Sequence, residues 1–275
     1  EPGAFASFVG KLTLTIEDGK IKSESYDLME VDPNVYEPNP EVAAVIEKEL
    51  APYKDEVNRV LGYTTTPMYR YFVVENPMDN FITDAARWKT GVDISLSNGF
   101  RFSPPIAIGE EGNAPIRKAD LWNMLPVNEY VKVGKASGSQ IKAWLEKELH
   151  NVFAQNPTER FGGWFVRFSG MEVKFYANNP KGERIESIMV NGEPIQDDKL
   201  YSMSACRREG EPLHVLCRMP NTVETEVLDY TIHDLIEEYL AAHPEVAPKK
   251  DGRAQALDLG DNVLSQLPGT DYHFH

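Results

Sequence analysis

An arginine placed just after a predicted strand is the clearest candidate for chemistry in this sequence. Val92, Ile94 and Leu96 alternate with polar residues, which is the period-two pattern of a β-strand. Asn98 and a glycine follow, a pair that tolerates left-handed backbone angles, and Arg101 comes next. A guanidinium is always charged and offers a planar fork of donors, so it suits capture of phosphate, sulfate or carboxylate. The alternative, a loop arginine paired with a local acid, stays open.

A second basic pair comes later in the chain. Arg207 and Arg208 directly follow another predicted strand, and Glu209 is placed to orient one of them through a charged hydrogen bond. We predict that Asn98, Arg101, Arg207 and Arg208 form an anion-binding set. The alternative for the pair is a solvated basic spot on an acidic protein.

The sequence offers no catalytic or metal centre of its own. Its six histidines are scattered, and none sits in an Asp-x-His or Gly-Asn-His motif. Nucleophile elbow, phosphate-loop and dinucleotide-binding patterns are missing from the sequence as well. We therefore predict a recognition domain with no catalytic residue and no metal ligand on this chain. The histidines concerned are His150, His214, His233, His243, His273 and His275.

Composition excludes several classes of partner. The chain has 275 residues, 41% of them apolar, and a formal net charge of -15. Such a charge repels nucleic acid and anionic membrane at long range, so neither is an expected partner. The sequence has no apolar run of about 18 residues, so no membrane-spanning helix is expected. It begins without the basic and apolar segments of a secretory signal, and we expect any such signal to be absent from this piece.

Local patterns predict an α+β fold with a mixed sheet flanked by helices. The pattern of residues 8–26 predicts a hairpin that turns at Asp18 and Gly19. The proline-rich composition of residues 31–40 is typical of a linker. Asn39 caps a predicted helix that Pro52 should kink or split. Further helices are predicted over 77–90, after Ser137 and over 225–240, and a second hairpin at Asn191 and Gly192.

Three motifs in a fixed order resemble a known family. The central one is Asp-Ile-Ser-Leu-Ser-Asn-Gly-Phe-Arg, residues 93–101. Asn-Phe-Ile-Thr-Asp-Ala precedes it at 80–85, and Asp-Leu-Trp-Asn-Met-Leu-Pro follows at 120–126. Together they resemble the carboxy-terminal domain of the 5'-nucleotidase family, and within it most of all the SoxB thiosulfohydrolases. The resemblance covers roughly residues 40 to 260.

The resemblance implies a larger hydrolase of which this chain is one half. Residues 1–38 would be a hairpin and linker from the end of a missing amino-terminal metallophosphatase domain. Residues 39–62 would be an interdomain helix, and residues 63–275 the substrate-binding domain. In such enzymes two divalent metal ions, here expected to be manganese, generate hydroxide in the missing domain. This chain alone would then hold no cofactor and be inactive.

Departures from the nucleotidase pattern favour the SoxB branch. Val127 stands where nucleotidases usually carry an aromatic residue, and the segment from Cys206 to Arg218 looks like the SoxB version. The resemblance then implies release of sulfate from a cysteine S-thiosulfonate on a SoxYZ-like carrier protein in the periplasm, during thiosulfate oxidation. Trp164 would border the pocket, although an aromatic residue that begins a strand is more often part of the core.

The resemblance to a periplasmic family also favours a disulfide between Cys206 and Cys217, while a free buried pair is the alternative. Two other functions stay open. The chain could belong to a 5'-nucleotidase or another nucleotide hydrolase, which would need a platform for the base. It could also be a stand-alone, non-enzymatic module that binds anions.

Overall fold

The computed structural model describes residues 6–70, 72–97 and 103–260. The chain forms two compact units, Glu1–Asn58 and Arg59–His275. Within the described ranges, none of the helices has the length and apolar character needed to cross a bilayer. The α+β expectation is confirmed, because strands of mixed direction alternate with helices in the second unit.

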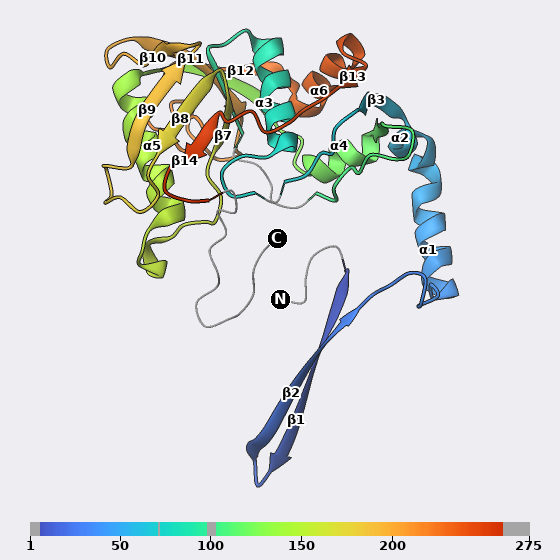
Figure 1. Ribbon diagram of the computed structural model, residues 1–275. Helices are drawn as coiled ribbons and strands as arrows, with labels where there is room; N and C mark the ends of the chain where they lie inside the picture. Colours follow the sequence, from blue (N-terminus) through green and yellow to red (C-terminus); the bar gives the residue numbers. More distant parts are fainter. Residues whose placement is uncertain (1–5, 71, 98–102, 261–275) are drawn as a thin grey trace. The chain divides into compact units, whose positions relative to one another are not determined.

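The first unit is built from a hairpin and a broken helix (Figure 1). Strands β1 (Phe8–Glu17) and β2 (Lys20–Glu30) pair antiparallel, and every residue of both is exposed. Asp18 and Gly19 join them with φ of 51° and 73°. Two successive residues with positive φ are the signature of the tight hairpin turn that the sequence predicts.

The helix of the first unit begins and breaks where the sequence indicates. The Asn39 side chain accepts hydrogen bonds from the amides of Glu41 and Val42, which satisfies donors at the helix start. Pro52 lacks an amide proton and interrupts the helix. The helix therefore divides into α1 (Pro40–Leu50), the 3-10 turn η1 (Ala51–Tyr53) and α2 (Lys54–Asn58).

The second unit is organised around a five-stranded sheet in the order β12-β6-β11-β4-β7. In this sheet β4 and β11 run parallel and the other pairs are antiparallel. Its strands are β4 (Ile94–Ser97), β6 (Tyr130–Ser137), β7 (Arg167–Ser169), β11 (Leu200–Cys206) and β12 (Val223–Thr231).

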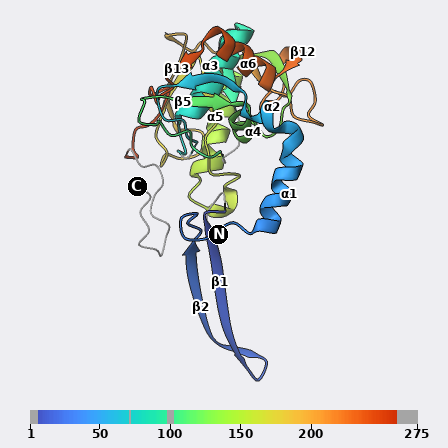
Figure 2. The same ribbon diagram turned by 90° about the vertical axis from the view of Figure 1, so that its right-hand side faces the viewer.

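Two smaller sheets complete the second unit. One has the order β10-β9-β8-β14, and the other the order β13-β3-β5; β5 and β13 are labelled in Figure 2. Their strands are β3 (Val60–Thr64), β5 (Ala114–Arg117), β8 (Met171–Phe175), β9 (Ile185–Val190), β10 (Glu193–Pro194), β13 (Glu245–Val246) and β14 (Ala254–Ala256).

Helices cover both faces of the five-stranded sheet. Helix α5 and the β8–β9 pair share one apolar cluster with Ile94 and Leu96 of β4. Helices α3, α4 and α6 form a second cluster that includes Val131 of β6. Burial of each large apolar side chain contributes about 1.5–3 kcal/mol. The helices are α3 (Pro77–Thr90), α4 (Lys118–Met124), α5 (Gly138–Phe153), the 3-10 turn η2 (Pro157–Glu159) and α6 (Ile232–Ala242).

The predicted helix over 225–240 is wrong for residues 225–231. Residues 223–231 form β12, and α6 begins only at Ile232. The β-branched residues at Val223, Thr225 and Val227 favour a strand, and β12 pairs with β6. Thr231 then caps the helix, because its hydroxyl accepts from the Asp234 amide while the Asp234 carboxylate accepts from the Thr231 amide.

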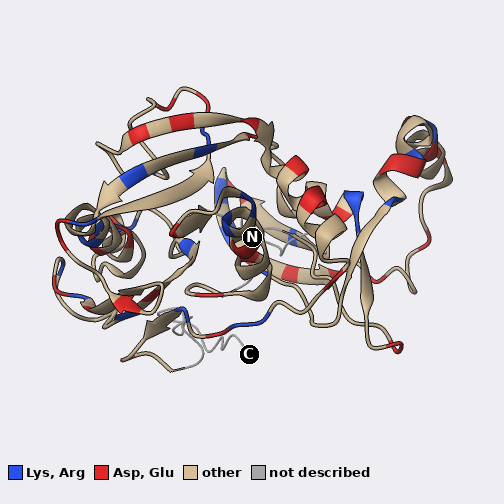
Figure 3. Cartoon of the chain, turned by 90° about the horizontal axis from the view of Figure 1, so that it is seen from above, with Lys and Arg blue, Asp and Glu red and all other residues tan. Residues whose placement is uncertain are grey.

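The negative charge is distributed over the molecule. Figure 3 shows acidic residues on strands, helices and loops, interspersed with basic ones.

Candidate functional site

Four chain segments meet at one edge of the five-stranded sheet. Ile94 of β4 lies opposite Met203 of β11 in the parallel pair, so both strands end at this edge. Strands β6 and β7 run antiparallel to them and begin there, with Ser97 of β4 opposite Arg167 of β7. The residues that follow β4 and β11 and those that precede β6 and β7 therefore lie close together at this edge.

A cavity of about 410 Å³ lies at this edge. Its volume falls within the range of small-ligand sites. Three of its walls come from the end of β4, the end of β11 and the segment before β6. The lining residues are Ser97, Leu125, Val127, Glu129, Ala205, Cys206, Arg207, Arg208, Glu209 and Cys217.

Both arginines predicted after β11 line this cavity. The Arg207 amide donates to the Tyr130 carbonyl at 2.8 Å, which continues the pairing of β11 with β6 by one residue. Arg207 is half-buried and Arg208 is exposed. Within the described ranges neither guanidinium forms an ion pair, and Glu209 lines the cavity without a hydrogen bond to either. The cavity therefore presents two guanidiniums that lack an ion-pair partner among the described residues, together with the carboxylates of Glu129 and Glu209.

A buried lysine fixes the loop that carries this charge. The Lys132 side chain, 1% exposed, donates through Nζ to the carbonyls of Pro212 at 2.9 Å and Val215 at 2.5 Å. Burial lowers the pKa of Lys132, the Glu211 carboxylate opposes that shift and Arg207 adds to it. Lys132 thus ties the loop after β11 to strand β6.

Not every predicted residue can be placed at the cavity. Asn98 and Arg101 lie outside the described residues, although Ser97, directly before them, lines the cavity. Trp164 precedes β7 at the same edge and is half-buried, but it does not line the cavity. The Arg167 guanidinium carbon lies 5.9 Å from the centre of the Trp164 ring. A role for these three residues in binding stays a prediction.

Sequence reasoning missed a buried ionic cluster made by Arg70, Asp79 and Arg167. Arg70 Nη2 lies 2.6 Å from Asp79 Oδ1, and Arg167 Nε lies 3.3 Å from Asp79 Oδ2. All three residues are at most 4% exposed. Burial alone would raise the pKa of Asp79, but Arg70 and Arg167 outweigh it and hold that pKa below its ordinary value. Burial lowers the pKa of Arg167 to about 10, against the opposing pull of Asp79.

This cluster holds the start of β7 in place. Arg167 Nη1 donates to the carbonyls of Val73, Val74 and Phe165 at 2.6–2.7 Å. Arg70 Nη1 donates to the carbonyl of Met124, next to the cavity wall at Leu125. The one signal in the sequence is an arginine at 167 within an otherwise apolar run, since charged residues are rarely fully buried unless paired.

The two cysteines lie in the same cavity wall as free thiols. Burial raises the pKa of Cys206 to about 11 and that of Cys217 to about 12. Cys217 and Arg218 have φ of 48° and 67° in the tight turn between Leu216 and Met219. Left-handed backbone is uncommon for these residue types, and such strain often accompanies functional sites. The disulfide between the two cysteines stays a prediction.

The described residues do not gather into a metal-binding set, and the resemblance expects the metal ions in the missing domain. Groups of three or more histidine, cysteine, aspartate or glutamate side chains able to hold a metal ion do not occur over 6–70, 72–97 and 103–260. The buried histidine His233 has a structural role. Its Nε2 forms a hydrogen bond with the Leu125 carbonyl at 2.8 Å, and its ring packs edge-on against Trp122. Burial lowers the pKa of His233.

Comparison with known families gives one match to more than half of the chain. The family described as 5'-nucleotidase, C-terminal domain, matches residues 60–205. Those residues include α3, β4, β6, β7 and almost all of β11, and so most of the cavity edge.

Curated relatives resemble the chain at low identity. The trifunctional nucleotide phosphoesterase protein YfkN of Bacillus subtilis is 25% identical over 272 residues, which cover 93% of this chain and 18% of that protein. A 5'-nucleotidase of Diplobatis ommata is 22% identical over 275 residues, which cover 91% of this chain and 46% of that protein. The chain spans less than half of each of these relatives.

Solved structures share the fold. The sulfate thiohydrolase SoxB of Thermus thermophilus superposes with a TM-score of 0.78 at 20% identity, covering 94% of this chain and 46% of that one. A 5'-nucleotidase precursor of Thermus thermophilus superposes with a TM-score of 0.75 at 20% identity, covering 92% and 50%. At this level of identity the likeness concerns the fold.

Proposed function

This chain belongs to the 5'-nucleotidase C-terminal domain family, and on that premise we propose that it is the substrate-recognition half of a SoxB-like thiosulfohydrolase. The substrate in this proposal is a cysteine S-thiosulfonate on a carrier protein, and the product is sulfate. The whole enzyme would add a metallophosphatase domain, in keeping with relatives of which this chain spans less than half.

One observation carries the proposal: among its described lining residues the cavity has two guanidiniums without an ion pair and no aromatic ring. Arg207 and Arg208 offer donors to an anion, while Val127 and Leu125 supply narrow aliphatic walls. Over the described part of the lining, tyrosine, phenylalanine and tryptophan are all missing. A nucleoside base gains much of its binding energy by stacking on such rings. A peptide arm that ends in a thiosulfonate needs the charge and does not need the stacking platform.

The chemistry of recognition follows from the arginines. A sulfonate group has oxygens that accept bonds from a guanidinium, and charge-assisted bonds of this kind contribute about 1.5–3 kcal/mol each. In the proposal Arg101 joins Arg207 and Arg208, since it follows Ser97, a lining residue, by four positions in the sequence. These groups would hold the anionic end of the arm toward the reacting centre. Bond cleavage would take place in the accompanying domain, where two divalent metal ions, expected to be manganese, supply the hydroxide.

Location and partner belong to the same proposal. The carrier would be SoxYZ-like, with its cysteine on a mobile carboxy-terminal arm, and the enzyme would act in the periplasm. One structural neighbour is described as a precursor, which is compatible with an exported protein. This chain alone would bind the arm and leave it intact.

A nucleotide hydrolase is the second candidate. Two curated relatives are named as nucleotide-acting enzymes, and Trp164 lies at the same sheet edge as the cavity. In that case Trp164 would provide the stacking surface for the base. The two candidates differ in the ligand that the chain captures.

Calorimetric titration of this chain separates them. The probes are a short peptide whose cysteine carries an S-thiosulfonate and, separately, adenosine monophosphate. We expect the peptide to bind and R208Q to weaken it about tenfold, the loss of one charge-assisted contact. K181Q, an equal charge change at an exposed lysine outside the cavity, should bind as the parent does. Binding of the nucleotide in preference to the peptide would overturn the proposal in favour of the second candidate.

A further inference from the structure

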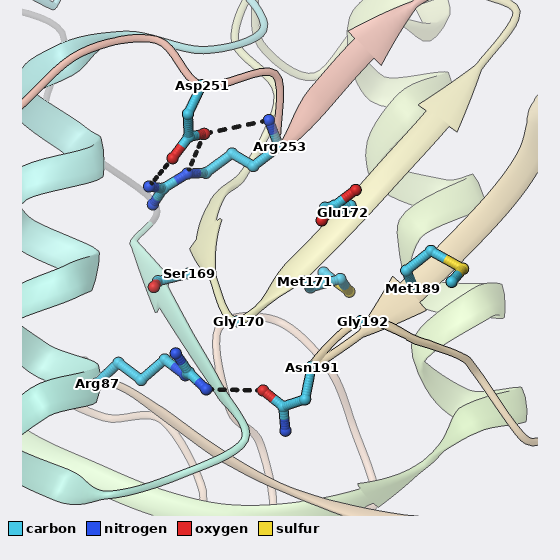
Figure 4. A pocket seen from close by; sticks show the side chains of 10 residues that line it. All are labelled: Arg87, Ser169, Gly170, Met171, Glu172, Met189, Asn191, Gly192, Asp251 and Arg253. Carbon is cyan, nitrogen blue, oxygen red and sulfur yellow. Dashed lines mark hydrogen bonds and ion pairs between the residues drawn. The ribbon is translucent and has the colours of Figure 1, made fainter.

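A second cavity, of about 590 Å³, lies at the far end of β7 from the candidate site (Figure 4). Strand β7 begins at Arg167, beside the first cavity, and ends at Ser169, which lines the second. The walls come from α3, the turn after β7, strands β8 and β9, and the segment before β14. The two cavities share no lining residue.

Arg87 supplies a partly free guanidinium to this cavity. Its Nε donates to the Asp93 carbonyl at 3.2 Å and its Nη2 to Asn191 Oδ1 at 2.7 Å. A guanidinium has five N–H donors, so three of them are uncommitted among the interactions of the described residues. Those residues also place no carboxylate in an ion pair with Arg87. Arg87 is half-buried, and its two hydrogen bonds fix the direction of the planar group.

The close contact of the Arg87 guanidinium with the backbone depends on a glycine at position 170. Gly170 has φ of +80°, and a Cβ atom there would lie 2.0 Å from the Asp93 carbonyl and 2.6 Å from Arg87 Nε. Only glycine leaves this space open. Because Gly170 has no side chain, the Arg87 guanidinium can pack directly against the backbone of the turn after β7.

The other arginine of this cavity is already neutralised. Arg253 Nη1 lies 2.9 Å from Asp84 Oδ1, and its Nη2 lies 2.6 Å from Asp251 Oδ2. Its Nε also donates to Asp251 at 2.9 Å. In Figure 4, Arg253 and Asp251 face each other along one side of the cavity. Arg253 is thus part of the wall and leaves Arg87 as the group able to take a new anion.

A free carboxylate lies across the cavity from Arg87. Glu172 on β8 is exposed, and its carboxylate has no ion pair or side-chain hydrogen bond with another residue of the described ranges. Met189 of β9 lies directly opposite Glu172 in the sheet and is half-buried, so it adds an apolar patch. Figure 4 shows Glu172 and Met189 on the strand side and Arg87 on the helix side.

We propose that this cavity binds a small zwitterion, such as a free α-amino acid with an apolar side chain. The carboxylate of the ligand pairs with Arg87, its ammonium group with Glu172, and its side chain rests on Met189. A multiply charged anion such as phosphate fits less well, because the carboxylates of Glu172 and Asp251 line the same space and repel it. The inference is independent of the proposed hydrolase function, since it uses other residues and another edge of the sheet.

Nuclear magnetic resonance titration of the isotope-labelled chain tests the proposal with L-leucine as the probe. We expect saturable shifts of amide signals around Gly170 and Gly192 in the millimolar range. N-acetyl-leucine lacks the ammonium group and leucinamide lacks the carboxylate, so each should bind at least about tenfold more weakly. Equal binding of N-acetyl-leucine and leucine would overturn the zwitterion assignment. Failure of leucine to give saturable shifts through the millimolar range would overturn the site itself.

Two variants make the test specific. E172Q removes the negative charge from an exposed side chain that has no ion pair or side-chain hydrogen bond among the described residues, so the fold should be unchanged, and leucine binding should fall about tenfold. E186Q is the matched control, because Glu186 is also exposed, on neighbouring strand β9, and does not line the cavity. Unaltered leucine affinity in E172Q would contradict the proposed contact.

Discussion

The buried cluster beneath the candidate site gives the sharpest prediction of stability. Replacing Asp79 with asparagine keeps the size of the side chain and removes the negative charge between Arg70 and Arg167. Both guanidiniums are then buried without a carboxylate partner. An asparagine amide group would also point donors at arginine donors, whichever way it is turned. We therefore expect D79N to be strongly destabilised.

The magnitude follows from the burial of the partners. Removing one member of a buried ion pair costs about 3–5 kcal/mol, because the remaining charge is left uncompensated. For a unit of this size, each kcal/mol lowers the melting temperature by about 2–4 °C. D79N should therefore melt about 6–20 °C below the parent chain. Thermal unfolding followed by circular dichroism measures this shift, and urea unfolding measures the free energy.

A matched control and a pH series complete the test. D197N removes the carboxylate of an exposed pair with Lys142, 2.6 Å apart, and should cost less than about 1 kcal/mol. The pKa of Asp79 is lowered in the folded state, so its stabilisation is present above the ordinary value of 3.8 and is lost as pH falls through the folded pKa. D79N should lack that acid-dependent loss. If D79N and D197N are equally stable, the cluster contributes little and the reasoning fails.

Two further predictions concern packing and thiol chemistry. Gly138→Ala should destabilise the chain by about 1–3 kcal/mol, because a Cβ atom there meets the Gln196 carbonyl at 2.2 Å; Gly163→Ala meets nothing within 4 Å and should be neutral in urea unfolding. Cys217, which is 4% exposed and has a pKa of about 12, should be alkylated by iodoacetamide at neutral pH at least about a hundredfold more slowly in the native than in the unfolded chain. Rapid labelling of Cys217 in the native protein, located by peptide mass spectrometry, would show that this thiol is not buried as described.

Local structure was predictable wherever neighbouring residues decide it. The turn at Asp18 and Gly19, the cap at Asn39 and the break at Pro52 each depend on two or three adjacent residues, and all are confirmed. Residues 225–231 were assigned wrongly to a helix because their strand conformation depends on pairing with β6, which lies about 90 residues earlier.

The site was predictable only in part for the same reason. The sequence indicates Arg207 and Arg208 because each follows a strand, and the structure brings both to one cavity with Ser97. It does not indicate the cluster of Asp79 with Arg167, since these residues are 88 positions apart and only the packing of α3 on β7 joins them. Contacts of this kind have no local pattern that a sequence can display.

The parallel pairing of β4 with β11 has a consequence for how the protein acquires its site. Ser95 and Ser204, whose hydroxyls are 3.0 Å apart across this pair, are 109 positions apart in the chain. Closing a loop of that length costs about 4 kcal/mol of chain entropy before the strands meet. Long-range pairing of this type is slow to form. On the ribosome, β4 and the covering helices α3, α4 and α5 emerge before β11, whereas α6 emerges after it, so the cavity takes shape late in synthesis.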